Sequence, residues 1–203
     1  GKRAVIDKRR CSGLVNFHQK LEAVKDFVGN LCEVGMVTAV KDNAEEFSFA
    51  YKNPIVKKCL LKAGNVLELK ALLLASTVRD KNGEKLYNDC SSGVVIDWDG
   101  KKDENGFEGT VNEIDLLLMR GFMPIFISCK NGGVDDAELY KLSSVAEMFG
   151  GKYAKKALIV TDFNRRGASK SYFLKRASDM GIKVIEGVNK MTDKAFAEQL
   201  SKI

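Results

Sequence analysis

The stretch from Glu113 to Lys130 decides the fold, and it reads Glu-Ile-Asp-Leu-Leu-Leu-Met-Arg-Gly-Phe-Met-Pro-Ile-Phe-Ile-Ser-Cys-Lys. Two apolar runs flank a short turn that contains glycine, a pattern that predicts two neighbouring strands of a hairpin. Asp115 lies in the first strand and Lys130 ends the second. Such charges have to be paired, solvated in a cleft or bound to a metal, because an unpaired buried charge is very costly. The hairpin therefore predicts a polar site in an otherwise apolar sheet.

The composition sets wide limits on the fold and on the partners. The chain has 203 residues, of which 45% are hydrophobic and 30% charged. This is an ordinary globular balance, and the length suits one or two small domains with a sizeable core. The net charge is +6, from 33 basic and 27 acidic residues. Its sign suits a polyanionic partner better than an acidic one, although a solvated basic surface would look the same.

Cysteine and histidine usage disfavours a disulfide framework and a zinc site. The five cysteines show no Cys-x-x-Cys spacing, and their odd number predicts reduced thiols in a cytoplasmic protein. His18 is the only histidine and has no clustered partner. No apolar run approaches the roughly 18 residues that a membrane span requires, so no membrane partner is expected. The chain begins with Gly1 rather than methionine, and we expect it to be a C-terminal fragment.

Residues 1–52 predict a small, mainly helical module, for which a winged helix is one possible form. Apolar residues recur at a helical period from Val15 to Glu33, and Glu46 to Tyr51 alternates like a short strand. The basic start of the chain suggests a flexible arm, or simply a frayed terminus. The basic residues of this start are Lys2, Arg3, Lys8, Arg9 and Arg10.

Residues 53–203 predict an α/β domain with a mixed sheet flanked by helices. Helices are expected at 64–78, 135–149, 168–180 and after Thr192, where the threonine suits a helix N-cap. Strands are expected at 92–98, 111–119, 122–129, 156–161 and 182–185. The polar, glycine-bearing segment 99–109 reads as a loop.

Strand alternation groups the polar residues of the hairpin. Glu113 and Asp115 are expected on one face of their strand, and Ser128 and Lys130 on one face of theirs. Carboxylates such as Asp115 hold Mg²⁺ or Mn²⁺, since these hard cations prefer oxygen ligands. The carbonyl of Cys129 is a further possible ligand. A lysine one strand away can orient a metal-bound water or offset developing negative charge.

Glu68 adds an acid to an otherwise apolar helix. It lies in the run Gly-Asn-Val-Leu-Glu-Leu-Lys-Ala-Leu-Leu-Leu-Ala, which starts at Gly64. It either occupies a thin solvent-exposed stripe of that helix or points toward the site. Lys70 shows that the stripe can carry charge, and the two alternatives stay open.

Several of these motifs together resemble a known nuclease family. They are Gly-x-x-Leu-Glu at 64–68, Asn-Glu-Ile-Asp at 112–115, Ser-Cys-Lys at 128–130, Ala-Glu-Leu-Tyr-Lys-Leu at 137–142 and Lys-Ala-Leu-Ile-Val-Thr-Asp at 156–162. The chain resembles the PD-(D/E)XK nucleases, which have a restriction-endonuclease-like fold. More narrowly, it resembles the nuclease domain of the CRISPR-associated CARF–nuclease effectors of the Card/Can type. The resemblance covers about residues 53 to 187.

The resemblance implies roles for individual residues. Asp115 takes the metal-binding aspartate position, Lys130 the catalytic lysine position and Glu68 the helix glutamate position, while Glu113 flanks the metal site. The family pattern has a carboxylate two residues before the lysine, and here that residue is Ser128. A serine hydroxyl is a neutral and weaker ligand for Mg²⁺ than a carboxylate.

Either another acid compensates for Ser128, or the site is weakened or dead. Acids in this fold also occur on a neighbouring helix. The candidates for the compensating acid are Glu113, Glu68 and Glu138.

The function implied by the resemblance is a metal-dependent endonuclease that cleaves DNA or RNA with Mg²⁺ or Mn²⁺. It would be the effector part of a CRISPR-linked antiviral defence protein. The expected partners are nucleic acid, a second copy of the chain, and cyclic oligoadenylate through a sensory domain outside this chain. A degenerate module that binds nucleic acid or a partner is the alternative. A third reading takes Asp115 and Lys130 as a structural ion pair, which would leave the charge of Glu113 without a partner.

The second half of the chain is basic, which fits phosphate contacts without choosing between DNA and RNA. Three aromatic residues lie among these charges and either stack on unpaired bases or pack in the core. They are Phe163, Tyr172 and Phe173. The basic residues are Lys152, Lys155, Lys156, Arg165, Arg166, Lys170, Lys175 and Arg176.

Overall fold

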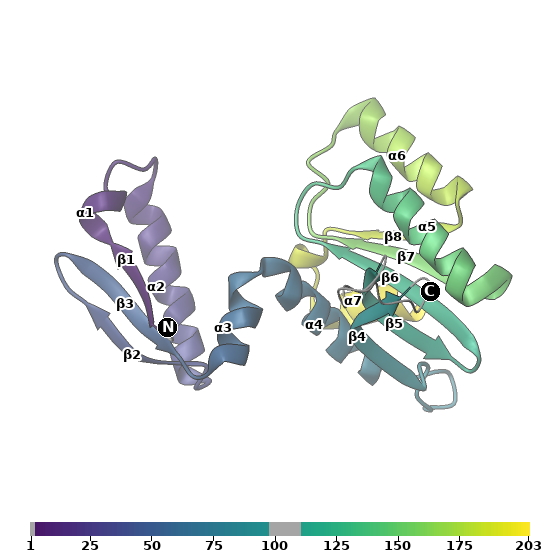
Figure 1. Ribbon diagram of the computed structural model, residues 1–203, viewed down its shortest axis with the longest axis horizontal. Coiled ribbons are helices and arrows are strands. Elements are labelled where there is room, and N and C mark those ends of the chain that lie inside the picture. The colour runs from purple at the N-terminus through teal and green to yellow at the C-terminus, as the bar shows by residue number, and fades with distance from the viewer. Residues whose placement is uncertain (1–2, 98–110) are drawn as a thin grey trace, which may run out of the picture. The chain divides into compact units, whose positions relative to one another are not determined.

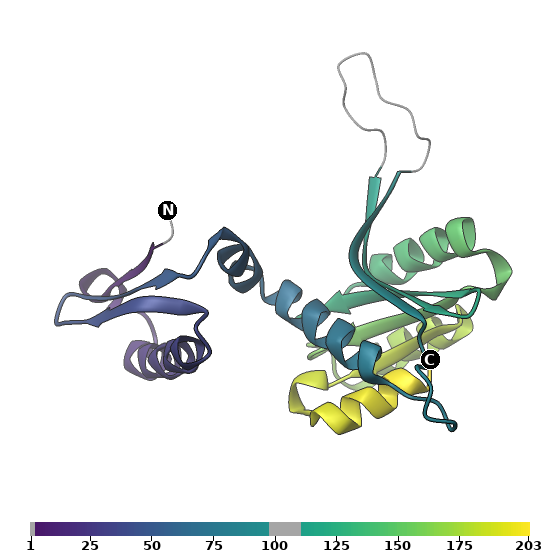
Figure 2. The ribbon, with the colours of Figure 1, turned by 90° about the horizontal axis from the view of Figure 1, so that it is seen from below.

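The computed structural model of the chain describes residues 3–97 and 111–203, and the loop predicted at 99–109 lies outside them. The chain divides into two units, Gly1–Ala63 and Gly64–Ile203 (Figures 1 and 2). The sequence places the boundary between residues 52 and 53. The structure has it between Ala63 and Gly64, because Val56 and Leu60 pack against the core of the first unit.

The first unit is built on a three-stranded antiparallel sheet with the order β1-β3-β2. The strands are β1 (Arg3–Asp7), β2 (Val37–Asp42) and β3 (Glu46–Tyr51). The helices are α1 (Lys8–Cys11), α2 (Phe17–Glu33) and α3 (Pro54–Leu61). Figure 2 shows α2 lying along one face of this sheet, where Leu21 and Val28 meet Phe47 and Phe49 in the core.

From Arg3 on, the basic start of the chain forms β1 and α1 of this unit and is not a free arm. Arg3 begins β1, and its guanidinium donates to Glu46 of β3 at 2.7 Å. Ala4 and Ile6 alternate inward and pack against the core of the unit. The elements of the unit follow one another as strand, short helix, long helix, hairpin and helix. The expected winged-helix form stays a prediction.

The second unit contains a five-stranded mixed sheet with the order β4-β5-β6-β7-β8. The strands are β4 (Asp89–Asp97), β5 (Val111–Arg120), β6 (Met123–Lys130), β7 (Lys155–Val160) and β8 (Ile182–Glu186). The first three are antiparallel, whereas β7 and β8 run parallel to β6. Lys130 therefore lies at the edge of the sheet where the three parallel strands end, a common location for ligand sites.

Helices cover both faces of this sheet, as the sequence predicts (Figure 1). One face packs against α4 (Ala63–Thr77) and α7 (Asp193–Ser201). The other packs against α5 (Asp136–Gly150) and α6 (Gly167–Asp179). Two short 3₁₀ segments complete the unit, η1 (Gly151–Tyr153) and η2 (Val188–Lys190). The fold is thus α/β, with a mixed sheet between helices.

Across residues 3–97 and 111–203, no helix combines the length and apolar character that a bilayer span requires.

Candidate functional site

The site begins at a bend in β5 at Asp115. Leu116 and Leu118 pack in the core on the α4 side of the sheet, whereas Ile114 packs in the core on the α5 side. A straight strand with a period of two would place all three on one face. The pairing of β5 with β6 also ends at Leu116. The strand therefore turns away from β6 at Asp115, and Figure 2 shows β4 and β5 curving out of the sheet.

Gly93 allows the same bend in the neighbouring strand. The pairs on either side of it are Ser92 with Leu116 and Val94 with Ile114, so Gly93 lies opposite Asp115. Its φ is +61°, a left-handed conformation that side chains with a Cβ rarely adopt. A glycine inside a strand marks a bulge or bend. Gly93 is thus the residue in the sequence that indicates the bend. The expectation that side chains alternate strictly along the strand does not take it into account.

The carboxylate of Asp115 fills the gap that opens between β5 and β6. Its Oδ2 accepts the backbone N–H of Cys129 at 2.7 Å and the hydroxyl of Ser128 at 3.1 Å. Both donors are neutral, so the aspartate is fixed in position without losing its charge to an ion pair. The N–H and C=O of one residue point to the same side of a strand. The carbonyl of Cys129 therefore faces the same gap.

Lys130 is paired with an acid on α5. Its ammonium lies 2.9 Å from Oε2 of Glu138, and both side chains are about a quarter exposed, at 29% and 27%. The structural ion pair between Asp115 and Lys130 is therefore not formed. Burial lowers the pKa of Lys130, but the hydrogen bond and charge of Glu138, helped by Asp115, raise it overall. Lys130 is consequently a cation at neutral pH and not a proton acceptor.

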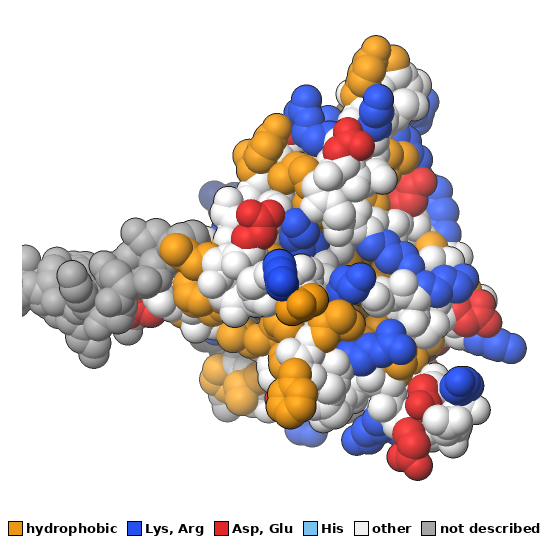
Figure 3. Space-filling view, turned by 90° about the vertical axis from the view of Figure 1, so that its right-hand side faces the viewer, with side chains coloured by type: hydrophobic (Ala, Val, Ile, Leu, Met, Phe, Trp, Pro, Cys, Tyr) orange, Lys and Arg blue, Asp and Glu red, His pale blue; other side chains and the backbone are white. Residues whose placement is uncertain are grey.

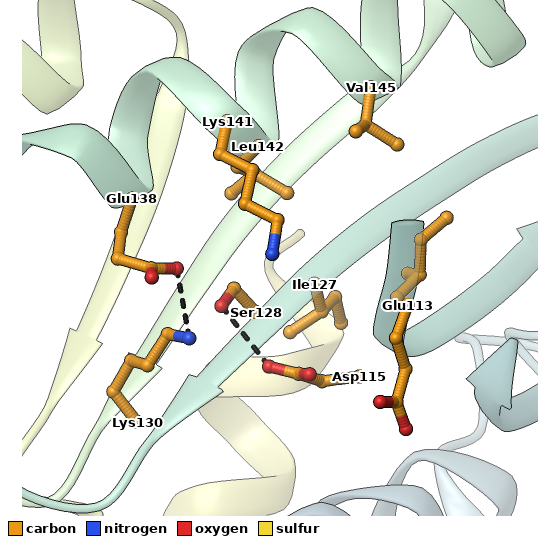
Figure 4. A pocket seen from close by; sticks show the side chains of 10 residues that line it. Glu113, Asp115, Ile127, Ser128, Lys130, Glu138, Lys141, Leu142 and Val145 are labelled. Carbon is orange, nitrogen blue, oxygen red and sulfur yellow. Dashed lines mark hydrogen bonds and ion pairs between the residues drawn. The ribbon is translucent and has the colours of Figure 1, made fainter. Parts of the chain in front are cut away.

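These residues line one small cavity between the sheet and α5, of about 40 Å³ (Figure 4). That volume holds a water molecule or a metal ion but not a nucleotide. A larger substrate would lie across the mouth of the cavity. The lining residues are Glu113, Ile114, Asp115, Ile127, Ser128, Lys130, Glu138, Lys141, Leu142 and Val145.

Lys141 is the lining residue that the sequence reasoning missed. It lies three residues after Glu138 on α5, a spacing that puts both side chains on one face of the helix. In Figure 4 its side chain extends from α5 toward Ser128. The spacing within Ala-Glu-Leu-Tyr-Lys-Leu is the signal that could have found it.

Glu113 lines the cavity with Asp115, but its side chain is exposed. Figure 4 shows its carboxylate on the far side of Asp115 from Lys130. Throughout residues 3–97 and 111–203, no group of three or more His, Cys, Asp or Glu is arranged to hold a metal ion. Any metal here would rest on Asp115, one or two neutral oxygens and its own water.

The side chain of Cys129 lies behind the site and not in it. The thiol is buried in the core on the α4 side of the sheet. Burial raises its pKa well above the ordinary value, and the charges of Asp115 and Glu68 act in the same direction. The thiol is therefore neutral and is no metal ligand. Only the backbone of Cys129 reaches the gap.

Glu68 is half-buried on α4, close enough to Cys129 to affect the pKa of its thiol. It is not among the described residues that line the cavity. Glu68 is therefore neither fully exposed to solvent nor among the described residues that line the cavity. The structure places it behind β6, near the backbone segment that holds Asp115.

Acids within the unit neutralise half of the basic residues singled out in the second half of the chain. Lys156 pairs with Glu147, Lys170 with Glu186, and both Arg165 and Arg176 pair with Asp136. On the face that Figure 3 shows, Lys and Arg lie among acidic and hydrophobic side chains.

The aromatic residues of this region divide between core and surface. Phe163 and Phe173 are buried and pack edge to face, with ring centroids 5.2 Å apart. Tyr172 is 73% exposed, so of these three it alone presents a ring to solvent.

Two solved structures show how widely this fold is shared. No protein-family model and no curated protein matches the chain. Protein VC1899 from Vibrio cholerae aligns with 98% of this chain and 46% of its own, with a TM-score of 0.65 and 16% identity. Can2 from Sulfobacillus thermosulfidooxidans, solved in complex with cyclic tetra-adenylate, aligns with 87% of this chain and 44% of its own, with a TM-score of 0.57 and 16% identity. The chain spans less than half the length of each protein and is similar to both in fold.

Proposed function

We propose that the second unit is a metal-dependent endonuclease that hydrolyses phosphodiester bonds in DNA or RNA. One observation carries the proposal. Asp115 is fixed by two neutral donors beside a cavity that also presents the ammonium of Lys130. An anchored carboxylate next to a cation in a small open cavity can bind a metal on one side and a phosphate on the other.

The donor set at this cavity suits Mg²⁺ or Mn²⁺. Asp115, the hydroxyl of Ser128 and the carbonyl of Cys129 are all oxygen donors, which these cations prefer. Mg²⁺ usually keeps several waters and binds through one or two carboxylates together with substrate phosphates. A three-acid cluster is therefore not required. When bound, such an ion would polarise the phosphodiester and lower the pKa of a bound water.

Lys130 would stabilise negative charge on the reacting phosphate. Its raised pKa keeps it protonated, so it donates hydrogen bonds and takes up no proton. The pair with Glu138 holds its ammonium on the α5 side of the cavity. A preorganised cation of this kind is worth most where water is largely excluded.

A binding module without cleavage is the second candidate, and Ser128 favours it. With serine at this position, Asp115 is, among the described residues that line the cavity, the one acid that is neither paired with a lysine nor exposed. The unit would then bind nucleic acid or a protein partner and leave the phosphodiester intact.

We further propose that the chain is the effector part of a CRISPR-linked defence protein that acts as a homodimer. Support comes from the motif resemblance and from the fold similarity to Can2, which was solved with cyclic tetra-adenylate. Cyclic oligoadenylate would act through a domain outside this chain.

Cleavage of plasmid DNA and single-stranded RNA with Mg²⁺ or Mn²⁺ tests the proposed activity. Wild type should cut, and Lys130→Ala should lower the rate by about 10² to 10³, as loss of one charge-stabilising donor does. The matched control is Lys202→Ala, because Lys202 is exposed just after α7, which covers the opposite face of the sheet from α5. Equal cutting by wild type and Lys130→Ala would exclude this site. Binding without cutting by wild type would favour the second candidate.

A further inference from the structure

Among the described residues that line the cavity, Lys141 is the one cation that forms no ion pair. The cavity is lined by three acids, Glu113, Asp115 and Glu138, and by two lysines, Lys130 and Lys141. Lys130 is paired with Glu138. Among the residues that the structure describes, Lys141 forms no ion pair, although its side chain extends into the same cavity.

The position of Lys141 is fixed by the packing of α5. Leu139, Leu142 and Val145 anchor the helix to the sheet, and each is less than a tenth exposed. The side chain of Asp135 caps its first turn by accepting the N–H of Glu138 at 3.2 Å. The helix therefore holds the backbone of Lys141 in place on the α5 side of the cavity, from where its side chain extends toward Ser128 (Figure 4).

We propose that Lys141 is a substrate-binding residue that contacts a backbone phosphate of the nucleic acid at the mouth of the cavity. This inference rests on the proposed function, because it assumes that the cavity receives a phosphodiester. A phosphate approaching without metal meets the carboxylates of Glu113 and Asp115, and Lys130 is already paired. Lys141 then supplies the only uncompensated positive charge among the described residues that line the cavity.

The ammonium of lysine suits this role because it is a compact point charge on a flexible stem. It can follow a phosphate without reading the base, so the contact should be independent of sequence. Lys130 and Lys141 would also have different roles. Lys130 serves the reacting group, whereas Lys141 contributes to affinity and positioning.

The size of the effect follows from counterion release. Each phosphate contact on duplex DNA contributes a slope of about −0.9 to the dependence of log K on log salt. Relative to 1 M salt, loss of one contact weakens binding by about eightfold at 0.1 M and about fourfold at 0.2 M. For a single strand the slope is about −0.7, which gives about fivefold at 0.1 M.

The test is fluorescence anisotropy of a labelled duplex and a labelled single strand in EDTA, with the whole chain and across a salt series. Lys141→Ala should weaken binding at 0.1 M salt by about eightfold for the duplex and about fivefold for the single strand. The slope of log K against log salt should become shallower by about 0.9 and about 0.7, the contribution of one phosphate contact. Lys141→Arg should retain most of the affinity. The matched control, Lys202→Ala, should bind like wild type, because Lys202 is exposed just after α7 on the opposite face of the sheet from α5.

Equal affinity and slope for wild type and Lys141→Ala would overturn the inference, as would equal losses in Lys141→Ala and Lys202→Ala. Lack of binding by wild type in EDTA would also overturn it. A role limited to balancing the charges of Glu113 and Asp115 would lower the melting temperature of Lys141→Ala and leave binding unchanged. Cleavage by wild type in Mg²⁺ is measured separately. Wild type that binds through Lys141 and never cuts would refute the nuclease and support the inference.

Discussion

Substitution of Asp115 separates its structural role from its chemical one. Its Oδ2 accepts the N–H of Cys129, a residue that is 5% exposed. Asp115→Asn keeps an oxygen that can accept this N–H but removes the charge. Asp115→Ala removes both the charge and the acceptor. The two variants should therefore differ in stability and agree in activity.

The stability difference can be worked from the lost acceptor. An unsatisfied N–H at a buried position costs about 1–3 kcal/mol. For a chain of this size about 2–4 °C is expected per kcal/mol, so Asp115→Ala should melt roughly 2–12 °C below wild type. Asp115→Asn should melt close to wild type. Thermal unfolding followed by circular dichroism measures both.

The activity of both variants should fall together. Removal of groups that only support a metal ligand costs about 10–100-fold, so loss of the ligand charge should cost at least about a hundredfold. Asp179→Asn is the matched control, because Asp179 is exposed at the end of α6. Cleavage by Asp115→Asn at the wild-type rate would refute the assignment of Asp115 as the charged ligand. Identical melting of Asp115→Ala and Asp115→Asn would refute the structural argument.

Three further outcomes are expected. Glu138→Gln removes the charge that contributes most to raising the pKa of Lys130, whereas the burial that lowers this pKa remains. The pKa of Lys130 should therefore fall, and the alkaline limb of the cleavage–pH profile should move to lower pH. Ser128→Glu should raise metal-dependent cleavage if the site lacks only the carboxylate, and no gain would point to Glu138 as the replacement. Burial raises the pKa of Tyr87 from 10.0 to about 12, and its hydroxyl donates to the carbonyl of Leu200 at 2.6 Å. The folded pKa is the higher one, so this stabilisation is complete below pH 10 and is lost as the pH rises toward 12. The free energy of unfolding should fall by on the order of 2–3 kcal/mol over this pH range. Tyr87→Phe should abolish this pH dependence. Chemical denaturation at pH values between 10 and 12 measures the free energy of unfolding of both proteins.

The second unit was predictable because its elements carry strong periodic signals. The helix expected at 135–149 is α5 (Asp136–Gly150), and the strand expected at 122–129 is β6 (Met123–Lys130). Apolar strands that alternate with amphipathic helices favour a sheet covered by helices on both faces. Local pattern and tertiary packing agree here, so the sequence alone was sufficient.

The sheet of the first unit was predicted only in part, because two of its strands lack such a signal. In β2 (Val37–Asp42) Val37 is the only buried residue, and Ala39 has a φ of +52° where the pairing with β3 is irregular. The basic residues around β1 read as an arm because their acidic partners lie more than thirty residues away along the chain. Glu46, for example, lies opposite Asp7 and pairs with Arg3. Pairings of this kind are set by the register of the sheet and not by local pattern.

The sequence was sufficient to propose the residues of the site but not their hydrogen-bond and ion-pair partners. Alternation places Ser128 and Lys130 on one face, and the structure puts both beside α5. Alternation also placed Glu113 and Asp115 on one face, and both line the cavity, but the side chain of Glu113 is exposed there. The acceptor role of Asp115 toward Cys129 exists only because β5 leaves β6 at this point.

The pairing of Lys130 with Glu138 gives Ser128 a physical context. A carboxylate at position 128 would place a negative charge on the same strand face as Lys130, two residues before it. Glu138 places that charge beside the same ammonium from α5, at 2.9 Å. The lysine therefore has an acidic neighbour although position 128 is neutral. Glu138 cannot neutralise Lys130 and give both its oxygens to a metal at the same time, so metal binding at this site depends mainly on Asp115.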